Sequence, residues 1–352
     1  MKLKICLLVI STFMLHNAFA SILLVNNTAG GPGQYTQIND AVIAATAGDT
    51  IYVSGSAIAY NAAVNINKSI TMVGPGTFTQ KDMQFAANTR GFAISDGTTN
   101  VNITGFSFTL GNGGPFINIG LNASSIKIYN NYFTNACCAN NAITITQCHD
   151  LVIENNVFNL STHLIGGTVL TYNFIFRNNL IHLNGLAPIV NFAILNGVIE
   201  HNTFIAPSPG FAIFASTSNA IISNNIFYNA DPVAGTSGCV FNNNISFNTS
   251  GTAFGNLGGT NIDNTDPQFV NLATTTLSLT NNYNVSATGP AHNTASDSTD
   301  IGYYGGPAII NLTPYGEVYN MPVIRKMEIQ NLTVPQTGNV NVKVRSTISR
   351  VN

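Results

Sequence analysis

The stretch Ile128-Tyr-Asn-Asn-Tyr-Phe133 is one copy of a phrase that recurs through the middle of this chain. Each copy has the form apolar-x-Asn-Asn-x-apolar, where x is any residue and one copy has His in place of the first Asn. The later copies are Ile153–Phe158, Phe176–Ile181, Ile199–Phe204 and Ile222–Phe227. The second Asn falls at Asn131, Asn156, Asn179, Asn202 and Asn225, in steps of 25, 23, 23 and 23 residues. So regular a spacing indicates a repeat architecture.

The rest of each repeat has the pattern of short strands. Apolar residues lie two positions apart, as in Ile143/Ile145 and Leu151/Ile153, which is typical of a strand with one buried face. Turn residues such as Asn-Asn, Gly-Gly and Pro separate these strands. Wound as a coil, each strand pairs in parallel with its counterpart about 4.8 Å away in the next coil. The period therefore predicts an all-β fold, a parallel β-helix, and the Leu-x-x-Leu-x-Leu phrase of the rival leucine-rich solenoid is absent.

In such a coil, equivalent residues stack in columns. The five second asparagines of the phrase are expected to form a structural ladder at a bend. Asn tolerates a left-handed backbone at a bend, and its side-chain amide can bond the Asn of the next coil.

The N-terminus has the features of a secretory signal peptide. Lys2 and Lys4 precede an apolar run, Ile5–Leu15, which is too short to span a bilayer. Ala18-Phe-Ala20 follows, so cleavage is expected after Ala20. The mature chain is then expected in the periplasm, at the cell surface or outside the cell, without a membrane span.

The mature chain divides into two parts. Residues 21–310 are predicted to form the β-helix, with a short capping helix over 36–46 that covers the open end of its core. Residues 311–352 are predicted to be a β-hairpin extension or a truncated sandwich domain.

Charge is scarce along the whole chain. Only 7% of the residues are charged, whereas ordinary domains have roughly 25%. Between Arg90 and Arg325 the only basic residues are Lys127 and Arg177. Nucleic acid is excluded as a partner because the chain lacks a basic patch to neutralise phosphates.

The cysteines leave two interpretations open. Beyond the signal peptide the chain has Cys137, Cys138, Cys148 and Cys239. A pair such as Cys138–Cys148 can close in an oxidising compartment, or all four can be buried small hydrophobic residues. Their spacing and that of the histidines does not match a zinc site, and we predict neither metal nor cofactor.

Several phrases carry a resemblance to a known family. They are Gly48-Asp-Thr-Ile-Tyr-Val53, Lys68-Ser-Ile-Thr-Met-Val-Gly74, Asp266-Pro-Gln-Phe269 and Asp300-Ile-Gly-Tyr-Tyr-Gly-Gly306, together with the Asn-Asn coils. They resemble the pectin-lyase-like right-handed parallel β-helix superfamily, and more narrowly the secreted β-helix repeat proteins of Bacteroidetes-type bacteria. The resemblance covers roughly residues 34–306 and implies a right-handed coil. It leaves function open, because the superfamily holds lyases, hydrolases, esterases, epimerases and adhesins.

One column carries charge and supplies the catalytic candidates. Two residues before each ladder Asn it reads Tyr129, Glu154, Arg177, Glu200 and Ser223, and it is expected to face solvent. Two carboxylates two coils apart lie roughly 9.6 Å from each other, close to the upper limit of about 9.5 Å for an inverting glycosidase. The arginine between the two carboxylates is expected to pair with them, which leaves no cation to bind a substrate. This favours a surface ion-pair column over an active site. The last candidate, His201, replaces the first Asn of its pair, so a turn role is favoured over a catalytic one.

The sequence favours a non-catalytic extracellular scaffold over an enzyme. The alternative is a glycoside hydrolase or polysaccharide lyase of the same superfamily, but a lyase needs a cationic groove and the usual clustered Asp phrases of the hydrolases are absent. Polysaccharide or cell-surface material is the expected partner. Tyr129, Tyr132 and Tyr172 are the candidate sugar contacts, since the chain has no Trp.

Overall fold

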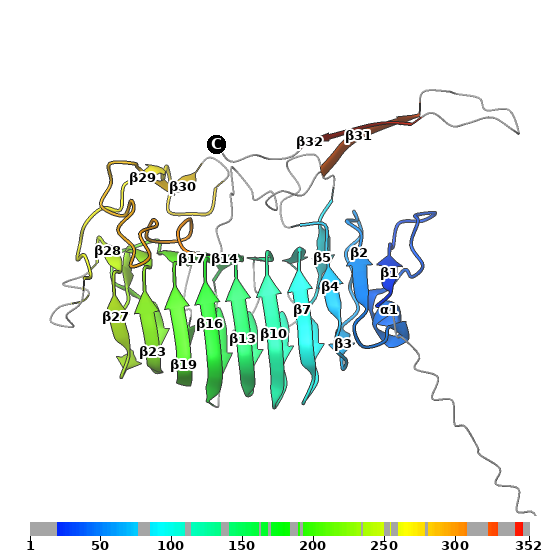
Figure 1. The fold of residues 1–352 in the computed structure, drawn as a ribbon, viewed down its shortest axis with the longest axis horizontal. Helices are drawn as coiled ribbons and strands as arrows, with labels where there is room; N and C mark the ends of the chain where they lie inside the picture. The colour runs from blue at the N-terminus through cyan, green and yellow to red at the C-terminus, as the bar shows by residue number, and fades with distance from the viewer. Residues whose placement is uncertain are drawn as a thin grey trace, which may run out of the picture.

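The computed structural model is a right-handed parallel β-helix in which one strand of each coil lies beside its counterpart in the next (Figure 1). The structure describes residues 20–76, 85–109, 114–134, 141–161, 163–167, 170–183, 189–190, 193–233, 235–249, 254, 260–278 and 281–307, and the backbone of 323–329 and 342–347. The predicted fold class is confirmed. The signal peptide, Cys137 and Cys138 lie outside the described residues.

Three sheets run along the solenoid. Sheet A contains β1 (Ile22–Val25), β2 (Thr50–Val53), β4 (Thr71–Val73), β7 (Thr99–Thr104), β10 (Ala123–Tyr129), β13 (Cys148–Glu154), β16 (Thr171–Arg177), β19 (Ala193–Glu200) and β23 (Thr217–Ser223), with β26 (Thr236–Ser237) and β27 (Val240–Asn242) both paired to β23. Sheet B contains β5 (Ala87–Thr89), β8 (Phe106–Phe108), β11 (Tyr132–Thr134), β14 (Val157–Leu160), β17 (Leu180–Leu183), β20 (Thr203–Ile205), β24 (Ile226–Tyr228) and β28 (Ile245–Phe247). Sheet C contains β3 (Val64–Ile66), β6 (Phe92–Ile94), β9 (Ile117–Ile119), β12 (Ile143–Ile145), β15 (Ile165–Gly167), β18 (Ile189–Val190) and β22 (Phe214–Ala215).

The smaller elements lie outside these sheets. They are the parallel pair β21 (Phe211–Ala212) and β25 (Ala230–Asp231), the antiparallel pair β29 (Phe269–Asn271) and β30 (Asn282–Val285), and the antiparallel pair β31 (Val323–Ile329) and β32 (Val342–Thr347). The last pair falls within the predicted C-terminal extension, whose boundary stays a prediction.

The core is built from columns of identical positions. In sheet A the register stacks Ile128, Ile153, Phe176, Ile199 and Ile222, all fully buried. In sheet B it stacks Phe133, Phe158, Ile181, Phe204 and Phe227, also fully buried. Within this column the ring centroids of Phe133 and Phe158 are 4.6 Å apart and those of Phe204 and Phe227 are 5.1 Å apart. Each such pair adds about 0.5–1.5 kcal/mol beyond the area it buries.

The N-terminal end of the core is capped by helix α1 (Ile38–Ala44). Its buried residues Ile38, Ala41 and Val42 belong to the same apolar cluster as the first coils. The predicted capping helix is thus confirmed, somewhat shorter than expected. None of the helices among the described residues is long and apolar enough to cross a membrane.

Residues 260–278 and 281–307, here called the closing segment, fold back over the outer face of sheet B (Figure 1). Tyr283 and Tyr303 of the closing segment are buried against Val157, Leu180 and Ile205 of the sheet. Sheet B is therefore buried on both faces over several coils, whereas sheets A and C present an outer face.

Two of the four cysteines can be described. Cys148 and Cys239 are free thiols, so the structure does not contain the Cys138–Cys148 bridge considered above. Burial raises the pKa of the Cys148 thiol to about 12, outweighing the opposing effect of the His149 backbone. Cys148 is a buried small hydrophobic residue, as the second interpretation expected, whereas Cys239 is only half-buried.

Candidate functional site

The asparagine column, Asn131, Asn156, Asn179, Asn202 and Asn225, lies at the turn from sheet A to sheet B. From Asn156 onward, each side-chain oxygen accepts a hydrogen bond from the backbone N–H and from the side-chain amide of the preceding Asn, at 2.8–3.2 Å. The oxygen of Asn131 accepts from the backbone N–H of Phe106 at 3.0 Å. The amides also donate to backbone carbonyls, as Asn179 does to Ile153 and Arg177. The column is buried, so it bonds neighbouring coils to one another and is not a binding surface.

The left-handed backbone falls on the other Asn of the pair. Asn130, Asn155, Asn178 and Asn224 have φ between 49° and 58°, and His201 has 50°. The second asparagines do not have positive φ, so the expectation that they supply the left-handed residue is wrong. The first residue makes the turn between the sheets, which leaves the second free to point its amide inward. His201 occupies the same turn position as the first Asn.

The charged column is assembled at the ends of β13, β16 and β19. Glu154, Arg177 and Glu200 are register partners. The Nε and Nη2 atoms of Arg177 are both 2.9 Å from Oε2 of Glu154, and Nη1 is 3.9 Å from Oε1 of Glu200. The stronger contact is therefore with Glu154.

Sequence reasoning missed the contact of this column with Lys127, whose register partner is Val152 in the neighbouring outward column. Its Nζ lies 2.5 Å from Oε1 of Glu154 and 4.8 Å from the ring centroid of Tyr129. The signal was present in the strand alternation, because Lys127 is two residues before Tyr129 and points to the same face. The two basic residues of the middle coils thus share one carboxylate.

Glu154 does not face solvent as expected, since only 4% of its surface is exposed. The alternation correctly placed it on the outer face of sheet A, but the side chains of Lys127 and Arg177 lie against its two oxygens. Glu200 remains half-buried. Both cations already have a carboxylate partner, so the column offers no unpaired cation for an acidic substrate.

The arginine should contribute more to stability than the lysine. We expect Arg177→Met to lower the free energy of unfolding by about 1–2 kcal/mol, because it removes a charge-assisted bond from a buried carboxylate. Lys127→Met, the matched control, should cost less, since the Lys127 side chain is 40% exposed and that of Arg177 is 25% exposed. Urea unfolding of both variants measures the difference. Equal losses would contradict the arrangement described.

His201 lies under the closing segment. Its Nε2 is 3.1 Å from the Asn224 amide and 3.3 Å from Oδ2 of Asp297. A Cβ added at Gly306 would lie 2.6 Å from the ring, so this glycine permits the close contact. Burial lowers the pKa of His201, against the opposing charges of Asp297 and Glu200. A buried, neutral imidazole at a turn is poorly placed to act on a substrate.

The three candidate tyrosines are not brought together in one site. Tyr129 lies beside Lys127, and Tyr172 stacks on His149 with ring centroids 4.9 Å apart. Tyr132 belongs to sheet B and packs with the cluster beneath the closing segment. They therefore do not form a sugar-binding platform.

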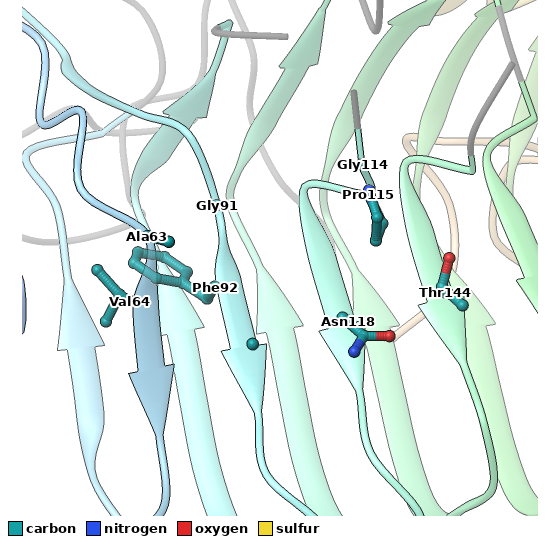
Figure 2. Close-up of a pocket in the computed structure, with 9 residues that line it drawn as sticks. Ala63, Val64, Gly91, Phe92, Gly114, Pro115, Asn118 and Thr144 are labelled. Atoms are coloured by element: carbon teal, nitrogen blue, oxygen red, sulfur yellow. The ribbon is translucent and has the colours of Figure 1, made fainter. Parts of the chain in front are cut away.

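A hollow over sheet C was not predicted (Figure 2). Its volume is about 330 Å³, at the lower end of the range of about 300–1,000 Å³ for ligand sites. Its lining comes from β3, β6, β9, β12 and the turns before them: Ala63, Val64, Gly91, Phe92, Ala93, Gly114, Pro115, Asn118 and Thr144. None of these residues carries a charge. The sequence signal was the run of small outward residues, of which Ala93, Asn118 and Thr144 are register neighbours.

Metal-site chemistry is not apparent in the described part of the chain. Within it, no group of three or more His, Cys, Asp or Glu side chains is arranged to hold a metal ion.

Comparison with known proteins does not assign a function to this chain. No family model and no curated protein matches the chain. Among solved structures, the PL6 family alginate lyase AlyGC and a mutant of it are similar at 12% identity, with TM-scores of 0.22 and 0.21. The matches cover 82% and 81% of this chain and 59% of each lyase chain. At these scores neither likeness bears on what this chain binds or cleaves.

Proposed function

We propose that this chain is an exported, non-catalytic scaffold that binds neutral polysaccharide or cell-surface material at the hollow over sheet C. The observation that carries the proposal is the lining of the hollow, which combines exposed amide and hydroxyl groups with apolar surface and has no charge. Such a lining suits the hydroxyl groups and apolar ring faces of neutral sugars. An acidic polymer would meet no cation there to offset its desolvation.

The alternative is a polysaccharide-degrading enzyme acting at the charged column. Glu154 and Glu200 favour it only by their spacing across two coils. Against it, Glu154 is buried under two cations and His201 is buried under the closing segment. A hydrolase needs one carboxyl group that can donate a proton and another that can reach water or the sugar. Glu154 is closed off by its two cations, so the column does not supply both groups.

A glycan array with neutral and acidic polymers tests the binding proposal. We expect retention of a neutral glycan and not of a polyuronate. Ala93→Trp should fill the hollow and weaken binding at least about tenfold, which corresponds to about 1.4 kcal/mol. Ser124→Trp is the matched control, because it places the same side chain on the outer face of sheet A and should leave binding unchanged. Equal binding by the two variants would show that the binding site is not the hollow over sheet C.

Product analysis separates scaffold from enzyme. Incubation with each retained polymer should release neither reducing sugars nor unsaturated products. If products appear and are lost in Glu154→Gln or Glu200→Gln while the fold persists, the charged column is an active site and the scaffold proposal is wrong.

A further inference from the structure

Asp49 joins the first strand, the capping helix and the second strand at the N-terminal end of the solenoid. Its Oδ1 accepts hydrogen bonds from the backbone N–H and hydroxyl of Ser21, at 2.7 and 2.8 Å. Its Oδ2 accepts from the backbone N–H and hydroxyl of Thr46, at 2.7 and 2.9 Å. Only 2% of the surface of Asp49 is exposed, whereas Ala20 and Ser21 are exposed.

Ser21, which contacts Asp49, is also the first residue after the predicted signal-peptide cleavage site. The sequence predicts cleavage after Ala20, so the nitrogen that contacts Asp49 is the one that cleavage would free. The Ser21 carbonyl is also fixed, since it accepts a hydrogen bond from the N–H of Thr50 at 2.9 Å. Ser21 is therefore held on both sides by the start of β2.

We propose that removal of the signal peptide creates an ion pair between the α-ammonium of Ser21 and Asp49, which fastens the first coil. An endopeptidase of the export machinery hydrolyses the Ala20–Ser21 bond. Water supplies the hydroxyl that leaves Ala20 as a carboxylate, and the Ser21 nitrogen takes up protons to become an ammonium. The inference rests on the predicted cleavage and is independent of glycan binding.

The electrostatics at this end suit such a pair. Burial by itself would raise the pKa of Asp49, but the hydrogen bonds from Thr46 and Ser21 lower it to about 2, so the carboxylate is charged at neutral pH. An α-amino group has an ordinary pKa of about 7.7–8.0 and is mostly charged at pH 7. Lys68 also reaches this end, but its Nζ donates to the carbonyls of Ile43 and Ala45. In the uncleaved chain only the acceptor of this hydrogen bond carries a charge. Cleavage adds a positive charge on the donor, so a Coulombic attraction is added to the hydrogen bond that is already present.

Two forms of the protein test the proposal. One begins at Ser21, released from a cleavable fusion, and the other begins at Ala18, so that Ser21 keeps an ordinary peptide N–H. We expect the Ser21 form to have the higher urea midpoint. The difference should disappear in Asp49→Asn, and it should persist in Thr46→Val, which weakens only the Oδ2 side. Equal midpoints for the two parent forms would overturn the proposal.

A chemical measurement covers the case in which Asp49→Asn does not fold. The ion pair should raise the pKa of the Ser21 amine, and each unit makes its acylation at pH 7 about tenfold slower. We expect acylation of the Ser21 α-amino group to be at least about tenfold slower in the folded Ser21 form than in the same protein unfolded in urea. An unchanged rate would overturn the ion pair. Mass spectrometry of the exported protein that shows a start other than Ser21 would overturn it as well.

Discussion

Asn179→Leu should destabilise the protein by at least about 3 kcal/mol, because it interrupts the buried asparagine column in its middle. The Asn179 oxygen accepts from the backbone N–H and the side-chain amide of Asn156, at 3.0 and 3.1 Å. Its amide donates to the carbonyls of Ile153 and Arg177 and to the oxygen of Asn202. Leucine can replace none of these bonds, and each buried polar group left without a partner costs about 1–3 kcal/mol.

The matched control is Asn118→Leu, which makes the same change at an exposed position of β9. A surface substitution of this kind should alter stability by no more than about 0.5 kcal/mol. Urea unfolding followed by far-ultraviolet circular dichroism measures both variants. If Asn179→Leu unfolds at the midpoint of the parent, the asparagine bonds do not contribute to the fold as described.

The coil could be predicted from the sequence because the residues that produce it lie close together in the chain and recur in every repeat. A 23-residue step places Asn156, Asn179 and Asn202 in register, and the alternation on either side assigns the buried columns. The same reasoning assigned the left-handed backbone to the wrong Asn of each pair. Period alone does not distinguish two adjacent asparagines, since either one can occupy the turn.

The closing segment could not be placed in the same way. It lies outside the repeat, and its contacts join residues far apart in sequence, such as Tyr303 N–H to the Thr203 hydroxyl at 3.0 Å. A partial signal did exist, because the position after the second Asn holds Val157, Leu180 and Ile226, which point outward from sheet B. An apolar outward column indicates that something covers it, but not which segment does.

The candidate site was predicted least well, for a related reason. The alternation gave the order of Glu154, Arg177 and Glu200, but burial of Glu154 depends on how two long side chains lie across it. The hollow over sheet C exists because its small side chains leave space between the larger ones. Neither feature produces a motif in the sequence.

Lowering the pH should weaken the contact between sheet B and the closing segment. His182 of β17 points into this interface, where it is fully buried. Its Nδ1 is 3.0 Å from the Thr275 carbonyl, and its ring makes an edge-to-face contact with Tyr283, with ring centroids 5.4 Å apart. Among the described residues, Nε2 has no hydrogen-bond partner. Burial lowers the pKa of His182 to about 4, although the Thr275 carbonyl opposes this.

The lowered pKa fixes the direction of the pH effect. Between the ordinary pKa of about 6.5 and the folded value of about 4, the unfolded chain binds a proton that the folded chain does not. Stability is therefore highest above about pH 6.5 and falls as the pH drops toward 4, with a loss from His182 of about 3 kcal/mol. The pKa of His201 is lowered in the same direction by burial, so it adds to the loss. The carboxyl groups with lowered pKa, Asp49 and Asp297, lose their contribution only at more acidic pH.

Urea unfolding between pH 7.5 and 4.5 measures this dependence. His182→Gln keeps a donor for the Thr275 carbonyl and does not titrate, so its stability should depend less steeply on pH than that of the parent. His163→Gln is the matched control, because it makes the same change at a half-buried position in the turn before β15 of sheet C. If His182→Gln and the parent lose stability in parallel over this range, His182 is not the group whose protonation loosens the closing segment.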